Sequence, residues 1–276
     1  MIAAASGRSV DADPGPSAAL AAIRSRGALV ALLFALAAIG WWWTAGEMRG
    51  MDNGPWTALG AAGWFLGVWV VMMGAMMLPS IAPTVALYAR VTRTRSPHLP
   101  LLFAGGYLLT WAGAGLVAVV VAATVGRIGG DVLSWDRAGR WVAGATLLIA
   151  ALYELTPLKD VCLGKCRSPL GWLLTSWRDG AVGAISMGAR NGAWCVGCCW
   201  ALMASLFALG VMSVPWMAFV AGLIALEKIL PSRRVATYAV TAALIVLGML
   251  LLVNPGALPA LTIPGHGMTS MAEMGP

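Results

Sequence analysis

The stretch from Leu101 to Val125 reads LLFAGGYLLTWAGAGLVAVVVAATV and contains no charged residue. An α-helix needs about 20 apolar residues to cross a hydrocarbon layer of roughly 30 Å, so this run is long enough to span a membrane. Similar runs recur along the chain, and the predicted spans are 28–46, 60–80, 101–125, 139–157, 194–212, 214–230 and 235–253. The sequence therefore predicts an all-α, polytopic membrane bundle of about seven transmembrane helices.

The composition of the whole chain supports the same class. Of its 276 residues, 60% are hydrophobic and only 11% are charged, whereas soluble domains carry about 25% charged residues. The net charge of +7 is expected in cytoplasmic loops, because Lys and Arg collect on that side of a membrane protein. No basic run is interleaved with aromatic residues as in nucleic-acid grooves. We expect the lipid bilayer as a partner, and no nucleic acid.

The Lys and Arg residues also orient the chain. With the N-terminus in the cytoplasm, fourteen of the 18 fall on the cytoplasmic side and four outside, which follows the positive-inside rule. Residues 1–27 are predicted to be a disordered cytoplasmic tail. Residues 28–253 then form the transmembrane domain, and residues 254–276 form a tail outside the membrane.

Five cysteines form two groups. CLGKC contains Cys162 and Cys166, and CVGCC contains Cys195 and Cys199, each pair at the i, i+4 spacing of one helix face. The predicted topology places all of them in the cytoplasm, where disulfides do not persist. Soft sulfur donors favour Cu(I), Zn or an iron–sulfur centre, and Lys159 with its basic neighbours would favour the thiolate form. The predicted metal ligands are Cys162, Cys166, Cys195, Cys198 and Cys199.

Methionines supply a second set of soft donors. VVMMGAMMLPS, from Val70 to Ser80, pairs Met72 with Met76 and Met73 with Met77 at i, i+4. Thioether and imidazole groups suit copper capture in an oxidising compartment, where thiols would oxidise. Methionine also fills gaps in helical cores, so packing stays an alternative. The candidate donors are Met72, Met73, Met76, Met77 and Met203 within the bundle, with His266, Met268, Met271 and Met274 in the outside tail.

Two acidic residues lie near cytoplasmic helix ends. Ionisable groups at membrane depth are functional candidates, so Glu154 and Glu227 are accessory ligand candidates. Glu154 lies five residues before Lys159, and Glu227 directly precedes Lys228. An interfacial ion pair is therefore the alternative for each of them.

The sequence does not support haem binding by two histidines or ATP-driven pumping. The two histidines, His98 and His266, fall on opposite sides of the predicted membrane, which excludes haem held by two histidines. No Gly-rich phosphate loop followed by Lys is present, so we expect no ATP-driven pumping.

Four blocks of sequence resemble a bacterial family of predicted metal-binding integral membrane proteins, some of which are labelled copper chaperones. The blocks are MMGAMMLPSIAP (Met72–Pro83), YELTPLKDVCLGKCRSP (Tyr153–Pro169), GAWCVGCCWALM (Gly192–Met203) and the pair Glu227–Lys228. The resemblance implies a multi-pass α-helical protein of the bacterial inner (plasma) membrane with a proposed metal site. The candidate residues that it carries over are Met76, Met77, Cys162, Cys166, Cys195, Cys198 and Cys199.

Together these features predict a protein that binds a soft metal ion for transfer or homeostasis rather than an enzyme. Cu(I) is the first expectation, with zinc or iron as alternatives, and a soluble or membrane-bound metal-accepting protein is the expected partner. A membrane thiol oxidoreductase, with the cysteines as a relay, is one alternative function. A structural assembly factor with packing cysteines is another. The oligomeric state is not predicted.

Overall fold

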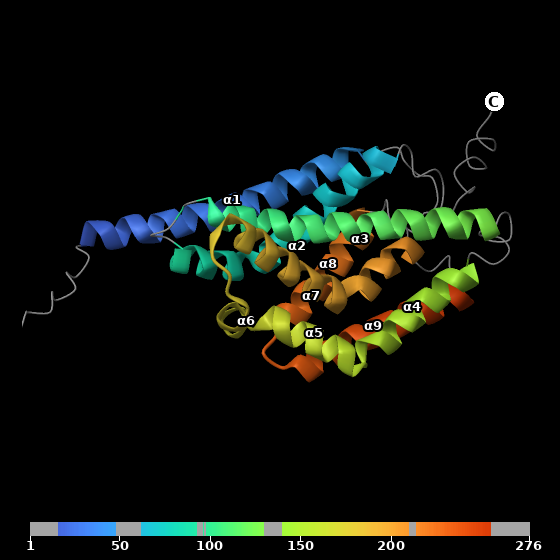
Figure 1. Cartoon of the computed structure of the whole chain (residues 1–276). Coiled ribbons are helices and arrows are strands. Elements are labelled where there is room, and N and C mark those ends of the chain that lie inside the picture. Colours follow the sequence, from blue (N-terminus) through green and yellow to red (C-terminus); the bar gives the residue numbers. More distant parts are fainter. Residues whose placement is uncertain are drawn as a thin grey trace, which may run out of the picture.

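The protein is represented by a computed structural model that describes residues 16–47, 62–92, 96, 98–129, 140–209 and 214–254. Every regular element in these ranges is an α-helix, so the predicted all-α class is confirmed (Figure 1). The helices are α1 (Pro16–Glu47), α2 (Ala62–Thr92), α3 (Leu99–Gly129), α4 (Arg140–Glu154), α5 (Pro157–Arg167), α6 (Pro169–Ser176), α7 (Gly180–Leu209), α8 (Val214–Ile229) and α9 (Arg233–Val253).

Four of the described helices are long and apolar enough to cross a membrane. Their candidate spans are Gly27–Gly46, Phe65–Thr92, Leu99–Val121 and Arg233–Val253. They correspond to the predicted spans 28–46, 60–80, 101–125 and 235–253. The bent pair Trp141–Glu154 and Pro157–Arg167 would make a fifth if it counts as one span.

The three remaining predicted spans take other forms. The run at 139–157 forms α4, which has 15 residues, and the run at 214–230 forms α8, which has 16. Each is shorter than the length of about 20 residues that spans a bilayer. Of the predicted fifth span, 194–212, residues 194–209 form the second half of a 30-residue helix, α7, which begins at Gly180. Residues 210–212 lie outside the described residues. The count of seven spans remains a prediction.

Helix α1 starts at Pro16, within the segment predicted as the cytoplasmic tail. Residues 1–15 and the outside tail from residue 255 onward lie beyond the described residues. The orientation of the N-terminus likewise stays a prediction.

Helix α2 extends past the predicted end of its span. The prolines Pro79 and Pro83 lie inside it without ending it, and the helix continues to Thr92. Proline removes a backbone donor and leaves carbonyls of the preceding turn without their usual partner. The hydroxyl of Ser80, which lies between the two prolines, donates to the carbonyl oxygen of Met77 at 2.7 Å.

A sharp bend separates α4 from α5. The predicted span 139–157 ends at Glu154, and the chain turns by 69° before α5 begins at Pro157. Thr156 caps the new helix, because its side-chain oxygen accepts a hydrogen bond from the N–H of Lys159. Proline suits the first position of a helix, where its missing N–H costs nothing. The bend redirects the cysteine-bearing α5 across the bundle.

Helix α7 lies at the centre and packs against α3, α4, α5 and α8. Its contact with α3 is close enough for the two backbones to touch. A Cβ atom at Gly188 would lie 1.9 Å from the carbonyl oxygen of Phe103, and one at Gly106 would lie 2.2 Å from that of Ile185. Small residues of this kind let membrane helices approach.

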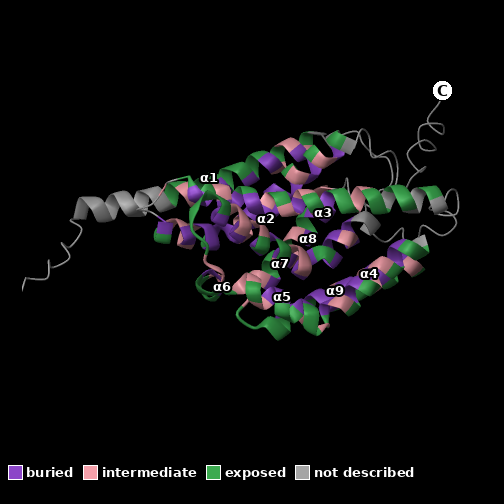
Figure 2. Cartoon of the chain, in the orientation of Figure 1, coloured by how far each residue is buried: buried purple, intermediate pink, exposed green. Residues whose placement is uncertain are grey.

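Burial divides the molecule into an enclosed centre and an apolar outside. Figure 2 shows many exposed residues on α1 and on the second half of α3, and buried residues gathered where the central helices meet. The exposed side of α3 carries Leu109, Leu116, Val117, Val120 and Val121. An outer surface of this composition is compatible with membrane insertion.

Candidate metal centre

Three cysteine sulfurs meet between α5 and α7. The Sγ atoms of Cys166, Cys195 and Cys198 all lie within 4.8 Å of one another, and those of Cys166 and Cys198 are 3.7 Å apart. Among the described residues, this is the one group of three or more His, Cys, Asp or Glu side chains close enough to hold one ion. Cys195 and Cys198 are almost fully buried, whereas Cys166 is half-buried. We call these residues the three-sulfur group.

The local sequence explains how the group forms. Cys195 and Cys198 are three residues apart on α7, so their side chains lie on neighbouring positions of one helix face. Cys166 comes from the last turn of α5, which packs against α7. The next residue, Arg167, donates to the backbone carbonyls of Glu227 and Leu230 near the end of α8. Arg167 thereby fixes the end of α5 that carries Cys166.

Two side chains from other helices donate to the sulfur of Cys195. The hydroxyl of Tyr107 on α3 donates at 3.1 Å, and the ammonium of Lys228 on α8 donates at 3.3 Å. Both donors favour a negatively charged sulfur over a neutral one. Cys195 is therefore the ligand whose thiolate form has the most support around it.

The backbone of Cys195 holds two further thiols. Its carbonyl oxygen accepts from the Sγ of Cys198 at 3.1 Å and from the Sγ of Cys199 at 2.9 Å. Of these two thiols, Cys198 belongs to the three-sulfur group and Cys199 does not. Cys162, one turn before Cys166, is buried with its sulfur close to Gly197, where an added Cβ would lie 2.9 Å from Sγ. Of the five predicted cysteine ligands, the structure brings three together and leaves these two beside them.

The candidate methionines of the bundle are enclosed in the hydrophobic core, at Met72, Met73, Met76, Met77 and Met203. One series of hydrogen bonds joins α2, which carries four of these methionines, to the three-sulfur group. Lys228, which donates to Cys195, also donates to the hydroxyl of Ser80 at 2.9 Å, and Ser80 donates to the carbonyl of Met77. The tail candidates His266, Met268, Met271 and Met274 lie outside the described residues.

The two acidic candidates share a buried lysine. The ammonium of Lys159 lies 2.6 Å from a carboxylate oxygen of Glu154 and 2.8 Å from one of Glu227. All three side chains are at least 98% buried. The structure therefore contains ion pairs, which were the alternative for both acidic residues. Glu227 pairs with Lys159 of α5, however, and not with its neighbour Lys228. Neither carboxylate belongs to the three-sulfur group.

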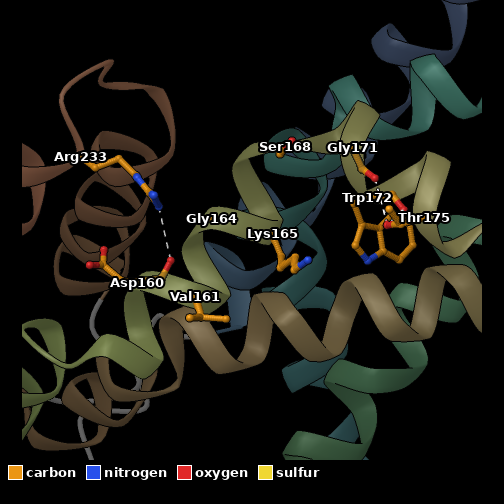
Figure 3. Close-up of a pocket in the computed structure, with 9 residues that line it drawn as sticks. All are labelled: Asp160, Val161, Gly164, Lys165, Ser168, Gly171, Trp172, Thr175 and Arg233. Atoms are coloured by element: carbon orange, nitrogen blue, oxygen red, sulfur yellow. Dashed lines mark hydrogen bonds between the residues drawn. The ribbon is translucent and has the colours of Figure 1, made fainter.

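A surface cleft of about 520 Å³ lies on the other side of α5, between α5, α6 and the start of α9 (Figure 3). Lys165 and Arg233 line it, and Arg233 donates to the backbone carbonyl of Asp160. None of the candidate ligands among the described residues lines this cleft. The three-sulfur group is a contact between helices rather than the floor of an open pocket.

Sequence reasoning missed Tyr107 as a member of the site. A tyrosine within the apolar run 101–125 is a polar group that needs a partner once buried, and this was the available signal. Its partner is 88 positions away along the chain, a distance over which periodicity carries no information. Sequence reasoning missed Ser80 for a similar reason. It lies between Pro79 and Pro83, and this segment is predicted only to kink or to pack.

The donor set consists of soft sulfur atoms, which fit a soft metal ion. Among the described residues no fourth Cys, His, Asp or Glu side chain joins the group, whereas structural zinc sites use four ligands.

Comparison with known proteins agrees with this chemistry. The pattern of a protein family described as copper chaperone (PpoB2) matches residues 66–251. Searches against curated proteins and solved structures found no match. The matched region covers well over half of the chain and includes α2 to α8 almost entirely, with all three sulfur donors. The chain therefore belongs to the copper chaperone family.

Proposed function

We propose that this protein binds Cu(I) through Cys166, Cys195 and Cys198 and passes it to an acceptor protein. The three-sulfur group carries the proposal, because three cysteine sulfurs within 4.8 Å of one another match the soft donors that Cu(I) prefers. The copper chaperone family to which the chain belongs supports the choice of copper. Zinc and iron–sulfur centres are disfavoured by the lack of a fourth ligand in the described part of the chain.

Transfer proceeds by exchange of thiolates. An incoming thiol of the acceptor loses its proton and binds the copper ion while the bond to Cys166 breaks, and the sulfur of Cys166 takes up a proton. Copper stays monovalent, so no oxidant or reductant is needed. Cys166 is the ligand that leaves first in this scheme, because it is half-buried while Cys195 and Cys198 are enclosed.

The protein works, in this proposal, in the bacterial inner membrane with its thiols on the cytoplasmic side. The four candidate spans support membrane insertion, and the distribution of Lys and Arg supports the orientation. The buried methionines of α2 and α7, and His266 with the methionines of the outside tail, then provide weaker donors along the route of the ion.

Elemental analysis of the protein, purified in detergent under reducing, anaerobic conditions and offered Cu(I), tests the proposal. The wild type should hold close to one copper ion per chain. The triple variant Cys166→Ser, Cys195→Ser, Cys198→Ser should hold none, because serine hydroxyls are poor ligands for Cu(I). A wild type without copper, or a triple variant that retains it, would overturn the proposed site.

The matched control is Cys199→Ser. Cys199 is as buried as Cys195 and Cys198, but its sulfur lies outside the three-sulfur group. A serine hydroxyl at this position can make the same hydrogen bond to the carbonyl of Cys195. This variant should keep its copper. Loss of copper in Cys199→Ser would show that the donor set is wrong.

A thiol–disulfide couple is the second candidate function. The 3.7 Å between the sulfurs of Cys166 and Cys198 favours it, since a small shift would bring them to bonding distance. Mass spectrometry separates the two functions. A protein that holds no copper and is isolated with a disulfide between these cysteines would favour the redox function.

A further inference from the structure

Lys228 is placed to act on the charge of the metal site. Its ammonium contacts the sulfur of Cys195 at 3.3 Å and the hydroxyl of Ser80 at 2.9 Å. Among the described residues, no carboxylate lies within ion-pair distance of Lys228. The neighbouring Glu227 is paired with Lys159 instead. The positive charge of Lys228 is therefore directed at the thiolates.

The charge of the copper complex depends on how many thiolates it contains. Cu(I) with two thiolates carries a single negative charge, and a third thiolate makes the complex doubly negative. Uncompensated charge is costly at a buried site, and Cys195 and Cys198 are almost fully buried. A neighbouring cation is thus what a third thiolate needs.

The position of the ammonium is fixed from two directions. Ser80 accepts from Lys228 and donates to the carbonyl of Met77, so α2 holds the lysine from one side. Its place in the last turn of α8 is held by the paired Glu227 and by Arg167, which binds the backbone there. These contacts hold the lysine beside Cys195 without a bound ion.

We propose that Lys228 is a positioning residue that sets the copper site to three sulfur ligands by compensating the charge of the third thiolate. The inference rests on the proposed function and adds a residue that none of the ligand candidates included. Without the charge of Lys228, the same cysteines hold Cu(I) with two sulfur ligands instead of three.

Copper X-ray absorption tests this inference, because it reports the number of sulfur neighbours and the Cu–S distance. The wild type should show three sulfurs. Lys228→Gln, which keeps a hydrogen-bond donor but removes the charge, should show two sulfurs at a shorter distance with copper still bound. Lys228→Met, a second neutral variant, should do the same. Lys228→Arg, which keeps the positive charge, should show three sulfurs. A merely structural role of the lysine would not require this result.

The matched control is Lys165→Met. Lys165 is next to Cys166 in sequence but is exposed on the cleft side of α5 (Figure 3), so its removal should leave three sulfurs. Three sulfurs in Lys228→Gln and Lys228→Met, or two in the wild type, would overturn the inference while leaving copper binding intact. A wild type that binds no copper would overturn the proposed function and this inference with it.

Discussion

Among single residues, Cys195 is the fixed point of the site. Its sulfur accepts from Tyr107 and Lys228, and its carbonyl accepts from the thiols of Cys198 and Cys199. Cys166 has no comparable support and is half-buried. The three ligands are therefore unequal, and we expect Cys195 to govern affinity and Cys166 to govern release.

Replacing Tyr107 with phenylalanine tests this inequality. The change removes one donor to the sulfur of Cys195 with little change of shape. A hydrogen bond to a charged group contributes about 1.5–3 kcal/mol, so the Kd for Cu(I) should rise roughly 10- to 150-fold. Competition titration with a Cu(I) chelator measures it. Tyr238→Phe on the exposed side of α9 is the control, and equal affinities in both variants would contradict the assigned role of Tyr107.

At the level of helices, the crossing of α3 and α7 depends on glycine. Replacing Gly188 with alanine puts a Cβ atom against the backbone of Phe103, which a side-chain rotation cannot relieve. Forced overpacking costs typically 1–3 kcal/mol. We expect a lower unfolding temperature in detergent, which thermal denaturation measures. We also expect weaker copper binding, because α3 carries Tyr107.

Gly105→Ala provides the control for that change. Gly105 is also on α3 but is exposed and has nothing within 4 Å of its would-be Cβ. Alanine is a better helix former than glycine by about 1 kcal/mol, so this variant should be as stable as the wild type or more so. Similar destabilisation in both variants would show that the close approach does not matter.

The cluster of Glu154, Lys159 and Glu227 joins α4, α5 and α8. Replacing Lys159 with methionine leaves two buried carboxylates without a cation, and breaking a buried pair in this way costs about 3–5 kcal/mol. We expect a large loss of thermal stability for the single variant. Adding Glu154→Gln and Glu227→Gln should recover part of it. If the single variant unfolds at the wild-type temperature, the cluster contributes nothing to joining these helices.

At the scale of the whole molecule, the orientation in the membrane is the open prediction. Ser168, in the turn between α5 and α6, is exposed, so a cysteine placed there in a cysteine-free background reports its side. We expect a membrane-impermeant maleimide to label Ser168→Cys only after the cells are broken, because the charge distribution puts this turn in the cytoplasm. Labelling in intact spheroplasts would reverse the orientation.

The sequence predicted the helices well and the site in part. Apolar runs define the helices because each span must hide its own backbone. The predicted spans 28–46, 101–125 and 235–253 correspond closely to the candidate spans within α1, α3 and α9, although α1 itself begins earlier, at Pro16. The spacing of cysteines predicted shared helix faces. It could not tell Cys166 from Cys162 as the partner of Cys195, since that depends on how α5 is rotated after its bend. Thr156 and Pro157 are the residues that mark the bend. They lie inside the run 139–157, which looked like one continuous span.

The adjacent residues Glu227 and Lys228 serve two different buried clusters, and this limits how α8 can vary in length. An α-helix turns by about 100° per residue, so inserting or deleting one residue between the buried Trp216 and Glu227 would turn both side chains away from their partners at once. Substitutions at the exposed positions Ala225 and Ile229 carry no such penalty. We expect related chains to tolerate changes of length before and after α8, but to keep its register unchanged.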